Sequence, residues 1–153
     1  MSKLEGDYIE FIKEVLEMDS LIAKRRGISV DLRVEGVIPR VYFDRKRMQQ
    51  VINNLVENAI KYSYNDFAVC VEIKRTDEMV MTGVVDQGLG IPSRERRKLF
   101  REFQTTRIKP MGNEEQIGLG LSIAQKIVRL HGGEIGFRSE LNKGSTFYFT
   151  LPV

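Results

Sequence analysis

One segment near the middle of the chain, QQVINNLVENAIKYS at residues 49–63, constrains the fold more than any other. At about 100° per residue, its polar residues Asn54, Asn58 and Lys61 share one helical stripe. The apolar residues fall in one broad arc on the other side: Met48, Val51, Ile52, Leu55, Val56, Ala59 and Ile60. Such a helix must bury one side against another layer. The segment therefore predicts a layered fold with one polar helix stripe.

The remaining patterns predict helices that alternate with paired strands. Helical periodicity covers residues 8–24, and a helix capped by Asp44 is expected to run to about Ser63. Further helices are expected at residues 93–103 and 119–130, and strands at 28–34, 41–43, 68–75, 79–86, 134–139 and 145–151. This order favours the α+β class over a doubly wound parallel sheet. We expect a two-layer α/β sandwich, in which helices cover one face of a mixed, mostly antiparallel sheet.

Length and composition exclude several classes of protein. A chain of 153 residues, 42% hydrophobic and 29% charged, is typical of one soluble globular domain. No apolar run approaches the roughly 20 residues that span a bilayer, and the start lacks a secretory pattern, so a cytoplasmic fragment is expected. The net charge of +3 is too small to indicate nucleic acid binding. Cys70, the single cysteine, excludes an internal disulfide, and its alternating surroundings predict a buried strand thiol.

The polar stripe of the 49–63 helix has the chemistry of a metal and phosphate site. An asparagine oxygen can coordinate Mg²⁺, and an ammonium group one turn away can meet the phosphates that the ion bridges. The alternative is an ordinary exposed helix face, where asparagine and lysine are common. Two asparagines inside a helix are mildly unfavourable for its propensity, which favours a functional reason for them.

Two glycine-containing segments suit the two ends of a nucleotide. Asp86 ends a predicted strand before Gly88 and Gly90, and its carboxylate can accept a hydrogen bond from the exocyclic amine of adenine. Gly118 and Gly120 can offer backbone amides to phosphate oxygens or serve as a hinge. An ordinary turn and an ordinary helix start are the respective alternatives. Neither GxxxxGK[ST] nor GxGxxG occurs, which disfavours a P-loop and a Rossmann site.

The segment between these glycines has no periodicity over residues 104–116, which predicts a loop that is either functional or mobile. Basic residues outnumber acidic ones over residues 94–109, as in a solvated face or a surface that steers a polyphosphate. His131, the only histidine, stands at a helix end before two glycines, so capping or packing is favoured over catalysis.

In this order, the motifs resemble the catalytic and ATP-binding domain of bacterial sensor histidine kinases, whose superfamily includes DNA gyrase and heat-shock chaperone ATPases. QQVINNLVENAIKYS resembles the N box, VVDQGLGIP the G1 box, LFREF the F box and IGLGLSIAQKIV the G2 box. HGGEI and KGSTFYFTLP resemble the closing elements of the family. The resemblance implies the Bergerat ATP-binding fold over residues 7–153, with residues 1–6 as residual linker.

The resemblance also implies a role for each matching residue. Asn58 would coordinate Mg²⁺, and Asn54 and Lys61 would approach the phosphates of ATP. Asp86 would bind the adenine amine, and Arg107 would contact the γ-phosphate, so Asn54, Lys61 and Arg107 are the candidate catalytic residues. The other candidate nucleotide-binding residues are Tyr62, Gly88, Gly90, Ile91, Phe103, Thr106, Gly118, Leu119, Gly120, Leu121 and Thr146. Phe100 would anchor the lid together with Phe103.

One departure distinguishes the chain from gyrase-like ATPases, which carry glutamate where Asn54 stands. An amide cannot act as the general base that activates water, whereas a neutral histidine imidazole needs less help. The resemblance thus implies transfer of a phosphoryl group to a histidine on a dimeric helical hairpin upstream, which then supplies a response regulator. We expect the isolated domain to be monomeric and the full-length protein to be a homodimer. The alternatives are a nucleotide-sensing module that has lost kinase activity and a gyrase-like ATPase.

Overall fold

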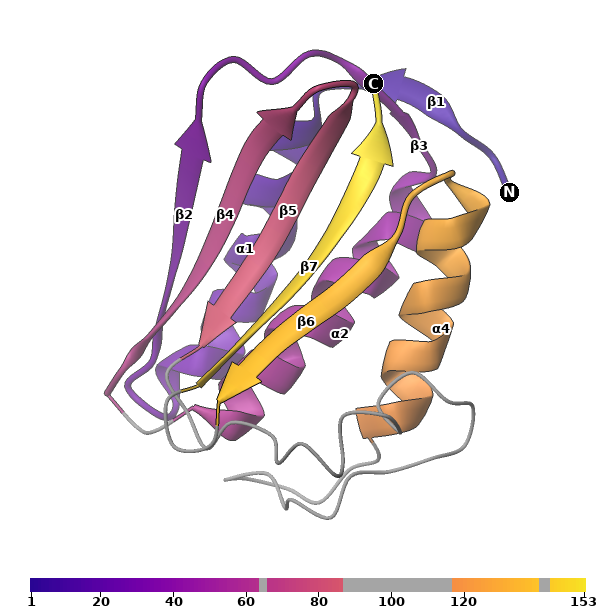
Figure 1. The fold of residues 1–153 in the computed structure, drawn as a ribbon. Coiled ribbons are helices and arrows are strands. Elements are labelled where there is room, and N and C mark those ends of the chain that lie inside the picture. The colour runs from indigo at the N-terminus through magenta and orange to yellow at the C-terminus, as the bar shows by residue number, and fades with distance from the viewer. Residues whose placement is uncertain (64–65, 87–116, 141–143) are drawn as a thin grey trace.

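The computed structural model describes residues 1–63, 66–86, 117–140 and 144–153 (Figure 1). Its elements are β1 (Leu4–Gly6), α1 (Tyr8–Lys24), β2 (Ser29–Glu35), β3 (Val41–Phe43), α2 (Arg45–Tyr62), β4 (Ala68–Thr76), β5 (Met79–Asp86), α4 (Ile117–Leu130), β6 (Ile135–Glu140) and β7 (Gly144–Pro152). The helix expected at residues 93–103 and the loop expected at 104–116 lie outside the described residues.

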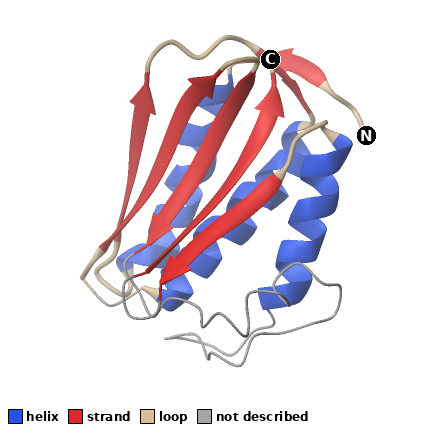
Figure 2. Cartoon of the chain, in the orientation of Figure 1, coloured by secondary structure: helices blue, strands red, loops and turns tan. Residues whose placement is uncertain are grey.

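The larger sheet has five strands in the order β2-β4-β5-β7-β6. Only the β2–β4 pair is parallel, and the other three pairs are antiparallel. The described helices cover one face of this sheet and leave the other face open (Figure 2). The predicted two-layer sandwich with a mixed, mostly antiparallel sheet is confirmed. None of the described helices is long and apolar enough to cross a membrane.

The helix α2 is the centre of the helical layer. Its N-cap is Asp44, as the sequence predicts, and the Asp44 side chain accepts a hydrogen bond from the Arg47 N–H at 3.2 Å. The predicted apolar arc is buried without exception: Met48, Val51, Ile52, Leu55, Val56, Ala59 and Ile60. Because this arc faces the sheet, the polar stripe lies on the side of α2 that is turned away from the sheet.

The core is closed on the α1 side by aromatic side chains. Tyr8 and Phe43 meet edge to face with ring centroids 5.5 Å apart, and Phe11 lies 4.9 Å from Phe43. The buried Tyr8 hydroxyl bonds the Thr82 hydroxyl at 2.7 Å, and burial raises the pKa of Tyr8. These contacts fasten the start of α1 to the middle of β5.

Two local features differ from expectation. Part of the stretch predicted as linker, Leu4–Gly6, forms β1 and pairs antiparallel with β3. Cys70 is half-buried on the open face of the sheet, so the prediction of a buried thiol is wrong. Alternation places Val69 and Val71 in the core and turns Cys70 away from it, and burial still raises the pKa of the thiol.

His131 has the packing and capping position that its sequence context favours. It is buried, its Nε2 accepts the Asp44 N–H at 3.0 Å, and its Nδ1 lies 2.8 Å from the Ile127 carbonyl oxygen. Nδ1 therefore carries the proton in this arrangement. The imidazole joins the end of α4 to the start of α2.

Candidate functional site

Three segments that the sequence singled out meet at one end of the sandwich. The last turn of α2, the end of β5 and the first turn of α4 all lie at the lower end of the molecule in Figure 1. The packing agrees, because α2 contacts both α4 and β5. This convergence brings the end of α2 that carries Asn58 and Lys61 to the same end of the fold as the end of β5, where Asp86 stands, and Asn54 lies one turn before Asn58.

The polar stripe of α2 is only partly accessible. Asn58 is 7% exposed, and Asn54 and Lys61 are half-buried. Asparagine in such a place normally needs hydrogen-bond partners or a ligand, because an unpaired buried amide costs about 1–3 kcal/mol. The degree of burial fits a site wall better than an ordinary solvated helix face.

Asp86 is the most deeply placed charged group of the candidate site. It is 3% exposed at the end of β5, and its Oδ1 accepts the Ser145 N–H at 3.2 Å. Asp86 and Ser145 are paired in the β5–β7 ladder, so the two residues share a face of the sheet. Burial of a carboxylate is costly unless donors surround it, and an adenine amine is one donor of the right kind.

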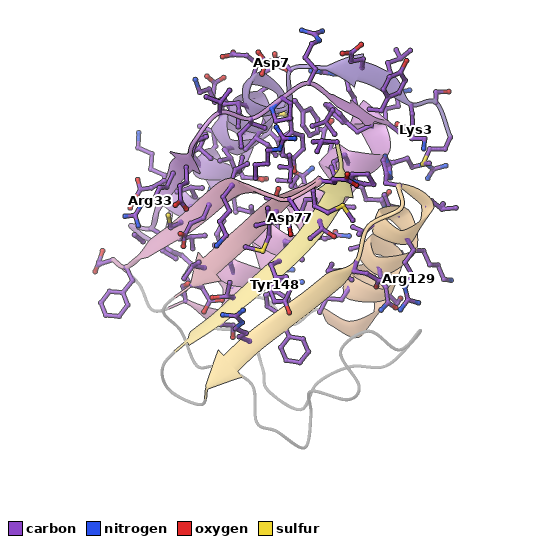
Figure 3. All side chains as sticks on the ribbon, turned by 45° about the horizontal axis from the view of Figure 1, so that its top comes forward. Lys3, Asp7, Arg33, Asp77, Arg129 and Tyr148 are labelled. Carbon is purple, nitrogen blue, oxygen red and sulfur yellow. The ribbon has the colours of Figure 1, made fainter. Side chains whose placement is uncertain are left out.

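Thr146 lies on the opposite face of the sheet from Asp86, which differs from the expectation that both residues contact the nucleotide. It pairs with Val85 and lines a groove of about 340 Å³ on the open face of the sheet, whose lining runs from Arg33 on β2 to Tyr148 on β7. Figure 3 labels these two lining residues at separate places on the sheet. Side chains alternate along a strand, so a shift of one residue moves the side chain to the other side. Ser145 is the residue of this motif that contacts Asp86.

The start of α4 also differs in detail from expectation. The helix begins at Ile117, two residues before the expected start at Leu119, so Gly118 also belongs to its first turn, together with Leu119 and Gly120. Their backbone amides therefore lie at the positive end of the helix dipole, which favours anions. Leu121 is fully buried in the hydrophobic core.

Several predicted site residues cannot be placed. Gly88, Gly90, Ile91, Phe100, Phe103, Thr106 and Arg107 lie outside the described residues, as does the side chain of Tyr62. Their roles remain predictions from the resemblance.

Sequence reasoning missed two groups that hold α2 in place. The Arg26 guanidinium, from the turn after α1, donates to the carbonyl oxygens of Ile60 and Ser63. Asp19 of α1 is 3% exposed, and the Asn53 amide nitrogen donates to both of its carboxylate oxygens at 3.1 Å, with the amide orientation assigned from this network. Arg26 stood in a basic run that was interpreted only as a helix stop, and Asp19 stood in the helical periodicity as an unremarkable polar residue.

Asp19 is a strongly perturbed carboxyl in the helical layer. Burial, and secondarily the charge of Glu57, raise its pKa to about 7. Asn53 and Glu57 precede Asn54 and Asn58 by one residue each, so this buried polar group lies beside the candidate site stripe.

The comparisons with known proteins agree with this fold. The adaptive-response sensory kinase SasA of Prochlorococcus marinus is 38% identical over 141 residues, which are 91% of this chain and 36% of that protein. The solved catalytic domain of histidine kinase ThkA is 31% identical, with a TM-score of 0.85 over 99% of this chain and 96% of that chain. ThkA in complex with the response regulator protein TrrA is 28% identical with a TM-score of 0.80, and 98% of this chain covers 41% of that one.

The family itself follows from a match over most of the chain. A model of the family described as "Histidine kinase-, DNA gyrase B-, and HSP90-like ATPase" matches residues 43–153. That range contains α2, β5 and α4, the three segments that converge at the candidate site. The chain belongs to this family of histidine kinase-, DNA gyrase B- and HSP90-like ATPases.

Proposed function

We propose that the chain is the ATP-binding kinase module of a two-component sensor histidine kinase. It transfers the γ-phosphoryl group of ATP to a histidine on a separate dimerisation hairpin, which then supplies a response regulator. The observation that carries the proposal is the buried Asp86 carboxylate at the same end of the fold as the end of α2 that carries Asn58 and Lys61. One nucleotide can engage both, with its base at Asp86 and its phosphates at α2.

The relatives support a modular activity and not a complete enzyme. The chain spans about a third of the length of the SasA sequence that it matches. In our proposal the remaining functions, namely sensing, dimerisation and the phosphoacceptor histidine, belong to other parts of a longer, homodimeric protein. A response regulator partner is proposed by analogy with the ThkA complex. We place the module on the cytoplasmic side, where ATP is available.

The side chains present fit ATP and Mg²⁺. When bound, ATP supplies the phosphoryl group that is transferred. Asp86 accepts from the adenine amine, Lys61 offsets phosphate charge, and the Asn58 carboxamide oxygen is a hard ligand that suits Mg²⁺. The described residues contain no cluster of three or more acidic, histidine or cysteine side chains that could hold a metal ion. Mg²⁺ is commonly held by one or two protein groups together with substrate phosphates and water.

In the proposed catalysis, the protein only positions the reacting groups and stabilises the charge of the phosphates. Phosphoryl transfer needs alignment of the attacking and leaving groups and compensation of charge, and little covalent work from the protein. Asn54 stands where a gyrase-like ATPase has its general base, and an amide cannot remove a proton from water. We therefore expect slow hydrolysis and productive transfer only when a histidine is supplied.

The experiment combines this chain with the phosphoacceptor hairpin of the full-length protein and γ-labelled ATP. We expect Mg²⁺-dependent labelling of the hairpin by a phosphate that is acid-labile and base-stable, as phosphohistidine is. A hairpin whose phosphoacceptor histidine is replaced by glutamine is the matched control and should remain unlabelled. Rapid release of inorganic phosphate without hairpin labelling would support the gyrase-like alternative. Nucleotide binding without either reaction would support a sensing module.

A further inference from the structure

The C-terminal end of α2 lacks the backbone arrangement that most often closes a helix. Its cap residue Ser63 is extended, with φ −80° and ψ 150°, and not left-handed. Ser63 N–H bonds the Ala59 carbonyl at 3.0 Å, but an extended cap cannot form the left-handed Schellman closure that satisfies several final carbonyls. Donors from another part of the chain can therefore satisfy carbonyl oxygens of the last turn.

Arg26 supplies those donors from a different part of the chain. One guanidinium nitrogen donates to the Ile60 carbonyl and the other to the Ser63 carbonyl, so the planar fork spans the last turn of α2. A cation at this end is also favoured by the helix dipole. The two bonded carbonyls lie on either side of Lys61 in the sequence, and Asn58 lies within one turn.

The guanidinium is itself held in position. Arg26 is half-buried, and burial lowers its pKa. Its backbone is fixed on both sides, because its N–H bonds the Ala23 carbonyl at 3.0 Å and its carbonyl accepts the Asp66 N–H at 3.3 Å. The turn between α1 and β2 is thereby joined to the segment that leaves α2.

We propose that Arg26 is a positioning residue for the phosphate end of the nucleotide site. It acts through the last turn of α2, where it sets the position of Lys61 and Asn58, and it does not contact the nucleotide. This inference rests on the proposed function. It predicts that loss of Arg26 weakens the binding of nucleotide phosphates and leaves the binding of adenosine, which engages only the Asp86 end, nearly unchanged.

The test is a set of NMR titrations of the isotope-labelled 153-residue chain with Mg²⁺–AMPPNP and, separately, with adenosine. For Arg26→Gln we expect the AMPPNP Kd to rise about tenfold, which corresponds to about 1.4 kcal/mol. The adenosine Kd should change less than twofold. Arg26→Lys should recover part of the loss, because an ammonium group can reach one carbonyl but cannot form the fork. The control Arg25→Gln changes the exposed neighbour, and both affinities should match those of the unmodified chain.

Each other outcome decides between the proposals. An equal loss of AMPPNP and adenosine affinity would mean that Arg26 acts only on overall structure, and unchanged affinities would mean that it does not position the site. If Arg26→Gln does not fold, the same comparison is made with Arg26→Lys, and an AMPPNP loss confined to that ligand supports the proposal. An unmodified chain that does not bind AMPPNP would overturn the proposed function and, with it, this inference.

Discussion

The two ends of α2 are held in contrasting ways. At the N-terminal end, Asp44 accepts the Ser2 N–H at 2.8 Å and the Arg47 N–H at 3.2 Å, and its own N–H bonds His131. These backbone bonds hold the pKa of Asp44 below its usual range. At the C-terminal end, the Arg26 guanidinium donates to the carbonyl oxygens of Ile60 and Ser63, and the Ser63 hydroxyl is buried without a hydrogen-bond partner among the described residues.

The contrast separates stability from binding within one helix. The well-satisfied N-terminal end lies away from the candidate site, and its bonds stabilise the fold. The C-terminal end carries Lys61 and, one turn earlier, Asn58, and it retains an unsatisfied polar group. Functional sites commonly sacrifice local stability in this way. We therefore expect substitutions at the first end to lower melting temperature and substitutions around the second to change ligand affinity.

The largest effect on nucleotide affinity is expected at Asp86, the proposed adenine contact. Asp86→Asn should weaken Mg²⁺–AMPPNP binding about 100-fold, because it removes a charge-assisted hydrogen bond worth roughly 1.5–3 kcal/mol and turns a donor towards the adenine amine. Calorimetric titration measures the affinity, and thermal unfolding should show a much smaller change. Undiminished affinity would refute the adenine assignment.

The next effect should appear at the N-terminal end of α2, and it should change stability instead of ligand affinity. His131→Leu leaves the buried Asp44 N–H without its acceptor, which should lower the free energy of unfolding by about 1–3 kcal/mol. Urea denaturation measures this loss, and AMPPNP affinity should stay within twofold of the unmodified chain. Arg129→Ala, a change at an exposed residue in the last turn of α4, is the control. A strong affinity loss with little destabilisation would break the proposed separation.

His131 shows which features of this fold can be predicted from the sequence and which cannot. Periodicity and capping identified α1, α2 and its Asp44 cap, and the sheet class followed from the order of helices and strand pairs. Burial of the α2 arc was likewise predictable, because it depends on local spacing. The capping role of His131 was favoured, but its partner 87 positions away was not, because that contact depends on tertiary packing.

The candidate site was predictable to a lesser degree. Convergence of α2, β5 and α4 came from a family resemblance, since spacing alone left a plain helix face and a plain turn open. Thr146 was assigned in place of Ser145 because motif matching does not determine which strand face a residue occupies. Arg26 was missed because a guanidinium that caps another helix has the same sequence signature as a helix stop.

A moderate, pH-dependent effect on stability is expected from Asp19 of α1, which contacts Asn53 midway along α2. Asp19 has its pKa raised from the ordinary 3.8 to about 7, mainly by burial and then by Glu57. Its contribution to stability is therefore fully present below the unfolded pKa and is lost as pH rises through the folded value. Melting temperature should fall between about pH 4 and pH 7.5 more steeply in the unmodified chain than in Asp19→Asn. Parallel pH profiles for the two proteins would contradict this origin.

The smallest effect is expected from the unsatisfied hydroxyl at the C-terminal end. Ser63→Ala removes a buried Oγ that has no partner, so the free energy of unfolding should rise by up to about 1 kcal/mol. Urea denaturation measures the change, and Ser20→Ala in α1 provides a control at an exposed hydrogen bond. A loss of stability in Ser63→Ala would mean that the Ser63 hydroxyl makes a stabilising hydrogen bond, which would contradict the contrast between the two ends of α2.

The central claim is that one nucleotide engages both Asp86 and the polar stripe of α2. A crystal structure of the chain with Mg²⁺–AMPPNP tests it most directly. We predict that the adenine amine lies within hydrogen-bond distance of the Asp86 carboxylate and that Mg²⁺ is bound by the Asn58 side-chain oxygen. A nucleotide bound elsewhere, or one whose base lies away from Asp86, would contradict the account.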